Sequence, residues 1–143
     1  PAASYYGRLA SGSIAGDLPR VDLAAEKRLA QLLVAQSPRL RAAKEASLGG
    51  LGVALAKLCV RGGCGAQVKL PPAKRHDWLL FGEYPAQAWV STRPADADRF
   101  ESAAKDAQVP VLRAGIAGGD ALMMDGVLRV PVRELSRAFA GQP

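Results

Sequence analysis

The sequence has 143 residues, of which 49% are hydrophobic and 6% aromatic, and its formal net charge is +6. This length and hydrophobic content predict one folded domain with a core of mainly Ala, Leu and Val, and they exclude a disordered chain. No run of about 18 apolar residues is present, which excludes a membrane-spanning helix. Two cysteines, Cys59 and Cys64, are too few for a disulfide framework, so we expect reduced thiols in a cytoplasmic protein. The first residue is Pro1 rather than Met, which indicates a processed product or a piece of a longer gene.

The positive charge is compatible with a binder of phosphate-bearing ligands or with a generally basic protein. Arg61, Lys69, Lys74 and Arg75 lie in a stretch without acidic residues. The basic residues nevertheless form no block of about five or six, and no aromatic side chains are interleaved with them as stacking platforms. We therefore expect no nucleic-acid partner.

Residues 1–20 are rich in Gly, Ser and Ala without a sustained period, and we predict a connecting segment anchored by Tyr5 and Tyr6. The first helix of the domain is predicted over 23–36, where Asp22 can cap the helix start. An apolar stripe follows at helical spacing, made by Ala25, Leu29, Leu32 and Leu33.

Ser37-Pro38 ends this helix, because the residue before a proline avoids helical angles. After a short stretch at 40–46, a second helix is predicted to begin near Ser47 and to end at Gly62-Gly63. Its apolar stripe consists of Leu48, Leu51, Ala54, Leu55 and Leu58.

The alternation at 66–70 predicts a strand, which Pro71-Pro72 closes. Residues 76–81 form a short segment of ambiguous type, and residues 86–92 are predicted to be a strand. Pro94 can occupy the first turn of a third helix, because its missing N–H has no partner there in any case. The buried stripe of this helix consists of Ala97, Phe100, Ala104 and Ala107.

The last part of the chain is predicted to hold a strand over 110–116 and a hairpin around Asp125-Gly126, the strongest short-range turn signal in the sequence. Pro131 starts a final helix with the apolar face Val132, Leu135 and Phe139. The order of elements is helix, strand, helix, strand, strand, helix, strand, hairpin, helix. This order predicts that residues 21–143 form a single α+β domain with a mixed β-sheet covered by helices.

The most unusual local feature is the segment Ser47-Leu48-Gly49-Gly50-Leu51, where two adjacent glycines occupy the first turn of a leucine-striped helix. Each glycine weakens a helix by about 1 kcal/mol relative to alanine, so the bare backbone must offer a compensating gain. One such gain is close approach of an anion to the free N–H groups at the helix start. The other is tight packing of the helix against a strand, which the pattern alone favours.

Three further features bear on chemistry. Phe81-Gly82-Glu83 places a carboxylate where it could hold a ligand hydroxyl or a metal, although a solvated turn is the commoner explanation. Gly118-Gly119-Asp120 precedes the hairpin and favours an ordinary turn. His76 is the only histidine, so neither a catalytic triad nor a zinc cluster with several His ligands is expected. The P-loop and G-x-G-x-x-G patterns are absent, and we expect no catalytic residue and no metal ligand in this chain.

The same segments resemble a known family. Residues 43–56, A-K-E-A-S-L-G-G-L-G-V-A-L-A, are similar to the stretch A-H-D-x-S-D-G-G-L-x-V-A-L-A in the second C-terminal-type domain of phosphoribosylformylglycinamidine synthase. Residues 79–83 resemble the family's L-F-G-E, residues 3–6 its G-S-E-Y, and residues 19–27 its P-x-V-D-L-x-x-E-K. The resemblance covers nearly the whole chain, because the closing blocks also follow in family order: Val109 to Gly115, Gly118 to Asp120 and Val130 to Leu135.

The resemblance implies a C-terminal domain of the aminoimidazole ribonucleotide synthase-like superfamily. It implies part of an ATP-dependent C–N ligase that uses Mg²⁺ and converts formylglycinamide ribonucleotide to the amidine in purine biosynthesis. The implied partners are the barrel half of the synthase and a glutaminase subunit or domain that supplies ammonia. The isolated chain is then expected to be inactive and to bind no cofactor tightly.

The resemblance also implies the position of a substrate or nucleotide site, formed where Ser47, Gly49, Gly50, Gly82 and Glu83 converge at one end of the sheet. The sequence departs from the family pattern nearby. Lys44 and Glu45 replace His and Asp, Leu48 replaces Asp, and Tyr84 stands where Ser or Gln is usual. The competing hypothesis is a non-catalytic ligand-binding or protein-interaction α+β module, which would not be expected to carry both glycine segments in this order.

Overall fold

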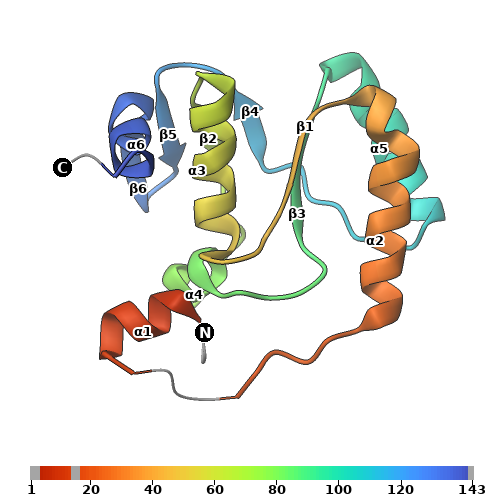
Figure 1. Cartoon of the computed structure of the whole chain (residues 1–143). Coiled ribbons are helices and arrows are strands. Elements are labelled where there is room, and N and C mark those ends of the chain that lie inside the picture. The colour runs from red at the N-terminus through yellow and green to blue at the C-terminus, as the bar shows by residue number, and fades with distance from the viewer. Residues whose placement is uncertain (1–3, 14–16, 142–143) are drawn as a thin grey trace.

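The computed structural model describes residues 4–13 and 17–141. Helices and short strands alternate along the chain, as the sequence predicted for an α+β fold (Figure 1). In chain order the elements are α1 (Tyr5–Ser11), α2 (Leu23–Gln36), the 3-10 helix η1 (Ser37–Arg39), β1 (Leu40–Glu45), α3 (Gly50–Gly62), β2 (Ala66–Val68), α4 (His76–Phe81), β3 (Ala88–Thr92), α5 (Pro94–Asp106), β4 (Gly115–Ala117), β5 (Ala121–Met124), β6 (Leu128–Pro131) and α6 (Val132–Phe139).

The strands pair in two groups. β1 and β3 form an antiparallel pair, and the other four strands form a mixed sheet in the order β4-β2-β5-β6. β2 and β5 run parallel, with Ala66 opposite Leu122 and Val68 opposite Met124. A parallel pair cannot be joined by a tight turn, so between β2 and β5 the chain passes through α4, β3 and α5 outside this sheet and then through its edge strand β4.

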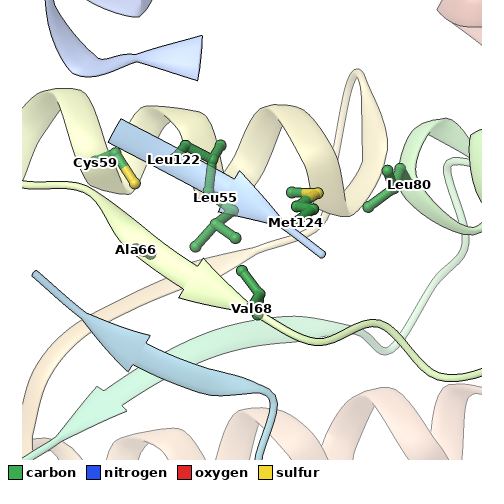
Figure 2. Close-up of a cluster of buried hydrophobic side chains, with 7 residues drawn as sticks. All are labelled: Leu55, Cys59, Ala66, Val68, Leu80, Leu122 and Met124. Carbon is green, nitrogen blue, oxygen red and sulfur yellow. The ribbon is translucent and has the colours of Figure 1, made fainter. Parts of the chain in front are cut away.

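The larger hydrophobic core lies between α3 and the four-stranded sheet. Figure 2 shows side chains from α3, β2, α4 and β5 meeting there, and Leu80 and Met124 are each 1% exposed. α6 packs beside α3 and contributes Val132 and Leu135 to the same core. The buried side chains of this cluster are Leu55, Cys59, Ala66, Val68, Leu80, Leu122 and Met124. Cys59 is a free thiol whose pKa is raised by its burial.

A second, smaller core joins α2 and α5 and packs on the β1–β3 pair. It consists of Leu32, Phe100 and Ala104, with Leu40 and Val90 from the two strands beside it. α2 begins at the predicted cap, where one carboxylate oxygen of Asp22 accepts hydrogen bonds from the N–H groups of residues 24 and 25 at 2.9 and 3.0 Å.

Several boundaries differ from the sequence predictions. The second helix begins at Gly50 rather than near Ser47. The φ angle of Gly49 is +85°, which is incompatible with a right-handed helix, so the residues before it cannot belong to α3. Leu48, which was predicted to belong to the apolar stripe, therefore lies before the helix and is 62% exposed. Phe139, at the last position of α6, is also 62% exposed, so the apolar face of that helix ends one turn earlier.

Two other segments also differ from prediction. The strand predicted over 110–116 is limited to β4, because its partner β2 offers only three residues for pairing. Residues 5–11, within the predicted connecting segment, form α1, which no apolar period indicates. The ambiguous segment at 76–81 is helical. No helix within the described residues is long and apolar enough to cross a membrane.

Candidate functional site

The two glycine segments singled out from the sequence meet in the folded chain. Gly49 forms the turn that enters α3, and Glu83 follows the end of α4. The N–H of Gly49 donates a hydrogen bond to Glu83 Oε1 at 3.0 Å. The carboxylate thus lies at the positive end of the α3 dipole, where a negative charge is stabilised. The two segments therefore lie in contact, as predicted.

Glycine is required in this turn for two separate reasons. Gly49 and Gly50 have φ values of +85° and +67°, a region that other residues rarely adopt. A Cβ atom on Gly50 would lie only 2.6 Å from the carbonyl oxygen of Gly82 and 2.7 Å from that of Leu80. The helix start is therefore pressed against the backbone that ends α4. Of the two explanations offered for the paired glycines, this geometry supports close packing, but the neighbour is the end of helix α4 and not a strand as predicted.

The segment after α4 is equally tight. A Cβ atom on Gly82 would lie 2.3 Å from Cε2 of the Tyr84 ring and 2.5 Å from the carbonyl oxygen of Trp78. The indole N–H of Trp89 donates to the carbonyl of Leu51 at 2.9 Å and ties β3 to the first turn of α3. The start of α3 is therefore fixed from two directions.

Ser47 contributes to the turn through its main chain. Its carbonyl accepts a hydrogen bond from the N–H of Gly50 at 2.8 Å, while the residue itself is exposed. All five predicted site residues thus lie around one turn. These contacts do not show that the five residues bind a ligand, and the ligand-binding role stays a prediction.

The N-terminal helix also reaches this turn. The N–H of Tyr5 donates to Glu83 Oε1 at 2.9 Å, so the same oxygen accepts from both Tyr5 and Gly49. The Tyr6 ring stacks on Phe81 with centroids 5.2 Å apart, and its hydroxyl donates to Asp77 Oδ2 at 3.0 Å. The sequence predicted Tyr5 and Tyr6 as anchors, but no local pattern identified Asp77 and Glu83 as their partners.

Asp77 is the most strongly perturbed acid near this site. Arg75 donates to it, with Nε 2.9 Å from Oδ1, and this bond holds the pKa of the Asp77 carboxyl well below its usual range. The bond from Tyr6 to Asp77 raises the pKa of the tyrosine. The guanidinium of Arg75 also lies over the Trp78 ring, 4.9 Å from its centroid. Asp77 therefore remains ionised as a fixed acceptor for Tyr6.

Three of the four positions that depart from the family pattern lie at the end of β1 or in the turn, and the fourth, Tyr84, follows Glu83. Lys44 forms an ion pair with Glu45, and this bond lowers the pKa of the Glu45 carboxyl. Leu48 presents an apolar side chain to solvent next to the helix start. Among the described residues, no group of three His, Cys, Asp or Glu side chains comes together to hold a metal ion.

The family comparison agrees with this architecture. Residues 3–122 match the model of the family described as AIR synthase related protein, C-terminal domain. The chain belongs to this family. The match includes α1, the glycine turn, the Gly82-Glu83 segment and the strands as far as β5, so the resemblance seen in the sequence is confirmed.

Curated relatives of this C-terminal domain are phosphoribosylformylglycinamidine synthase subunits. The chain is 37% identical over 148 aligned residues to subunit PurL of Anaeromyxobacter sp. (strain Fw109-5), covering 95% of this chain and 19% of that protein. It is 38% identical to PurL of Methylocella silvestris, covering 96% of this chain and 19% of the relative. The chain spans about a fifth of the length of the curated relatives it matches.

Solved structures of Thermotoga maritima PurL have the same fold. PurL complexed with FGAR superposes with a TM-score of 0.71 at 22% identity, covering 90% of this chain and 23% of the other. PurLQS from T. maritima gives a TM-score of 0.70 at 23% identity, covering 94% of this chain and 24% of the other. The mixed-sheet C-terminal-domain fold is therefore shown from the structures as well as from the family model.

Proposed function

We propose that this chain serves as the C-terminal-type domain of an ATP-dependent phosphoribosylformylglycinamidine synthase. The reaction converts formylglycinamide ribonucleotide, ATP and ammonia to the amidine, ADP and phosphate. ATP phosphorylates the amide oxygen of the substrate, and ammonia then displaces the phosphate. The domain would contribute the rigid turn at Gly49 and Gly50 to one wall of the substrate or nucleotide site.

The observation that carries the proposal is the junction of the two glycine segments. They lie 34 positions apart at the Gly49–Glu83 hydrogen bond, yet they meet in one tightly packed turn. A module without a synthase role would not need both segments in this order and in contact. Family membership and the identity to PurL subunits over 95% of the chain support the same assignment.

The remaining components of the reaction belong outside these residues. Phosphoryl transfer relies on metal ions and cationic groups positioned around the terminal phosphate. The described residues bring no three metal-binding side chains together, and Leu48 stands where the resemblance places an Asp. We propose that the barrel half of the synthase holds ATP and Mg²⁺, that a glutaminase supplies ammonia, and that the assembly works in the cytoplasm. The isolated chain is then inactive and binds ATP weakly or not at all.

A domain replacement tests this function. The matching fifth of a PurL subunit is replaced by this chain, and amidine formation is assayed with formylglycinamide ribonucleotide, ATP, Mg²⁺ and ammonia. Turnover is expected in the chimera but not in PurL lacking the segment. A chimera carrying Gly50→Ala is expected to lose turnover, whereas one carrying Gly119→Ala keeps it as the matched control. A folded chimera without turnover would favour the interaction-module hypothesis.

The isolated chain provides the complementary test. It is titrated with ATP and Mg²⁺ by calorimetry at moderate and at high salt. We expect no binding beyond a weak attraction to the net charge of +6, which fades as salt screens it. Salt-resistant binding in the micromolar range, or turnover by the chain alone, would contradict the division of roles proposed here.

A further inference from the structure

Contacts at the N-terminal end of α1 dock the helix on the rest of the chain. The helix has seven residues, none of which is buried, and Leu9 is 71% exposed. A helix this short is unstable in isolation, so tertiary contacts must hold it. Ser4 caps the helix by accepting from the N–H of Gly7 at 3.1 Å. Tyr5 and Tyr6 make further contacts.

The contacts of Tyr5 and Tyr6 lead to the segment between Asp77 and Glu83. Tyr5 donates to Glu83, and Tyr6 donates to Asp77 and stacks on Phe81. The docked helix therefore rests on α4 and on the residues that follow it, as Figure 1 shows for α1 and α4. The same segment is the surface against which the glycine turn of α3 is pressed.

Two routes connect α1 to the start of α3. In the first, Glu83 Oε1 accepts from Tyr5 and from Gly49 at once, at 2.9 and 3.0 Å. In the second, the Phe81 ring stacks on Tyr6 and also lies close to α3. A Cβ atom on Gly52 would lie 2.9 Å from Cε1 of that ring. Movement of α1 must therefore disturb contacts that the glycine turn also uses.

We propose that α1 is a strap that holds the glycine turn of α3 in place, with Glu83 as the shared acceptor and Phe81 as the shared packing surface. Release of the strap removes one of two donors from the carboxylate and uncovers the ring. The turn then becomes looser although none of its own residues has changed. The coupling is a property of this chain and holds whether or not it serves in a synthase.

The test follows the backbone N–H signal of Gly49 by nuclear magnetic resonance in the full 143-residue chain. Tyr6→Ala removes both the bond to Asp77 and the stacking on Phe81, and Tyr6→Phe removes only the bond. We expect Tyr6→Ala to shift the Gly49 signal and to speed its hydrogen exchange about ten-fold, because the turn opens more often. Tyr6→Phe should give a smaller change in the same direction. Leu9→Ala, on the exposed side of the same helix, is the matched control and should change neither.

Glu83→Gln tests the shared acceptor. Hydrogen bonds to an ionised acceptor are shorter and stronger than those to a neutral one, so the N–H signals of both Tyr5 and Gly49 should shift in this variant. In the Glu83→Gln background, Tyr6→Ala should have a smaller effect on Gly49 than in the unchanged chain, because one of the two routes is already weakened.

Two outcomes would overturn the strap. In one, Tyr6→Ala increases exchange throughout α1 while Gly49 stays unchanged, which makes the helix and the turn independent. In the other, exchange at the buried Leu122 of β5 rises as much as at Gly49, which makes the effect a general loss of stability. An unchanged Leu122 signal with an altered Gly49 signal supports the strap.

Discussion

Two of the three Gly-Gly pairs in the sequence form turns whose surroundings differ in the structure. Gly49-Gly50 begins α3, and Gly118-Gly119 joins β4 to β5. Both have positive φ angles, at +85° and +67° in the first turn and at +150° and +74° in the second. A Cβ atom on Gly50 would meet two carbonyl oxygens at 2.6 and 2.7 Å, whereas one on Gly118 or Gly119 would meet no atom within 4 Å.

The difference separates two uses of glycine. At Gly118-Gly119 the residue is needed only for its backbone angles, and the turn is held by main-chain bonds of 2.8 Å to Gly65 on both sides. At Gly49-Gly50 the missing side chain also makes room for a neighbouring backbone. We predicted an ordinary turn at Gly118-Gly119-Asp120, and the open space around the two glycines supports this. Only the first turn is built into the packing of the domain.

Gly50→Ala should lower the free energy of unfolding most. The left-handed angle costs an alanine about 1–2 kcal/mol, and forcing a methyl group against fixed backbone adds about 1–3 kcal/mol. We expect the free energy of unfolding to fall by about 3 kcal/mol or more, measured by urea denaturation. A loss below about 1 kcal/mol would mean that the α4 backbone can move aside, and the turn would then not be a close-packed one.

Trp89→Phe tests the hydrogen bond that ties β3 to the first turn of α3. The variant loses the 2.9 Å bond to the Leu51 carbonyl and part of the aromatic contact of Trp89 with the larger core. We expect a loss of about 1–2 kcal/mol in the free energy of unfolding, from one hydrogen bond and a partly buried surface. Equal stability of the variant and the unchanged chain in urea would show that the indole bond does not hold the first turn of α3.

Gly119→Ala should have a smaller effect than Gly50→Ala. Its only cost is the left-handed φ of +74°, since the space for a methyl group is open. We expect a loss of about 1 kcal/mol, read from the same denaturation curves. A loss as large as that of Gly50→Ala would remove the distinction between the two turns.

Leu48→Asp should change stability least. The side chain is 62% exposed, so little apolar surface is lost, and a carboxylate beside the start of α3 gains from the helix dipole. We expect a change within about 0.5 kcal/mol, with a gain at low salt that fades as salt is added. A clear loss of stability would show that Leu48 has an apolar contact that matters for folding.

The elements that the sequence predicted well have strong local signals. α2 starts at the Asp22 cap, α5 starts at Pro94, and the hairpin of β5 and β6 turns at Asp125-Gly126. Each of these signals acts within a few residues of the chain. α1 was not predicted because it has no apolar stripe, and β4 was placed too widely because the length of its partner sets its extent.

The candidate site shows the same division. The glycine segments were visible in the sequence, and their meeting followed from the resemblance to a family. The partners of Glu83 were not visible, because Gly49 and Tyr5 lie 34 and 78 positions away and donate through their main chains. Every residue except proline has a main-chain N–H group, so the residue type does not indicate which N–H donates to Glu83. Only the folded structure identifies these donors.

The pairing of distant strands has a consequence for how fast the chain folds. Ala66 pairs with Leu122 and Leu40 with Thr92, so loops of about fifty residues must close before either strand pair forms. Proteins dominated by such distant pairings refold in milliseconds to seconds rather than microseconds. During that interval the apolar strands β2 and β5 are exposed to other chains, and refolding at high protein concentration should compete with aggregation.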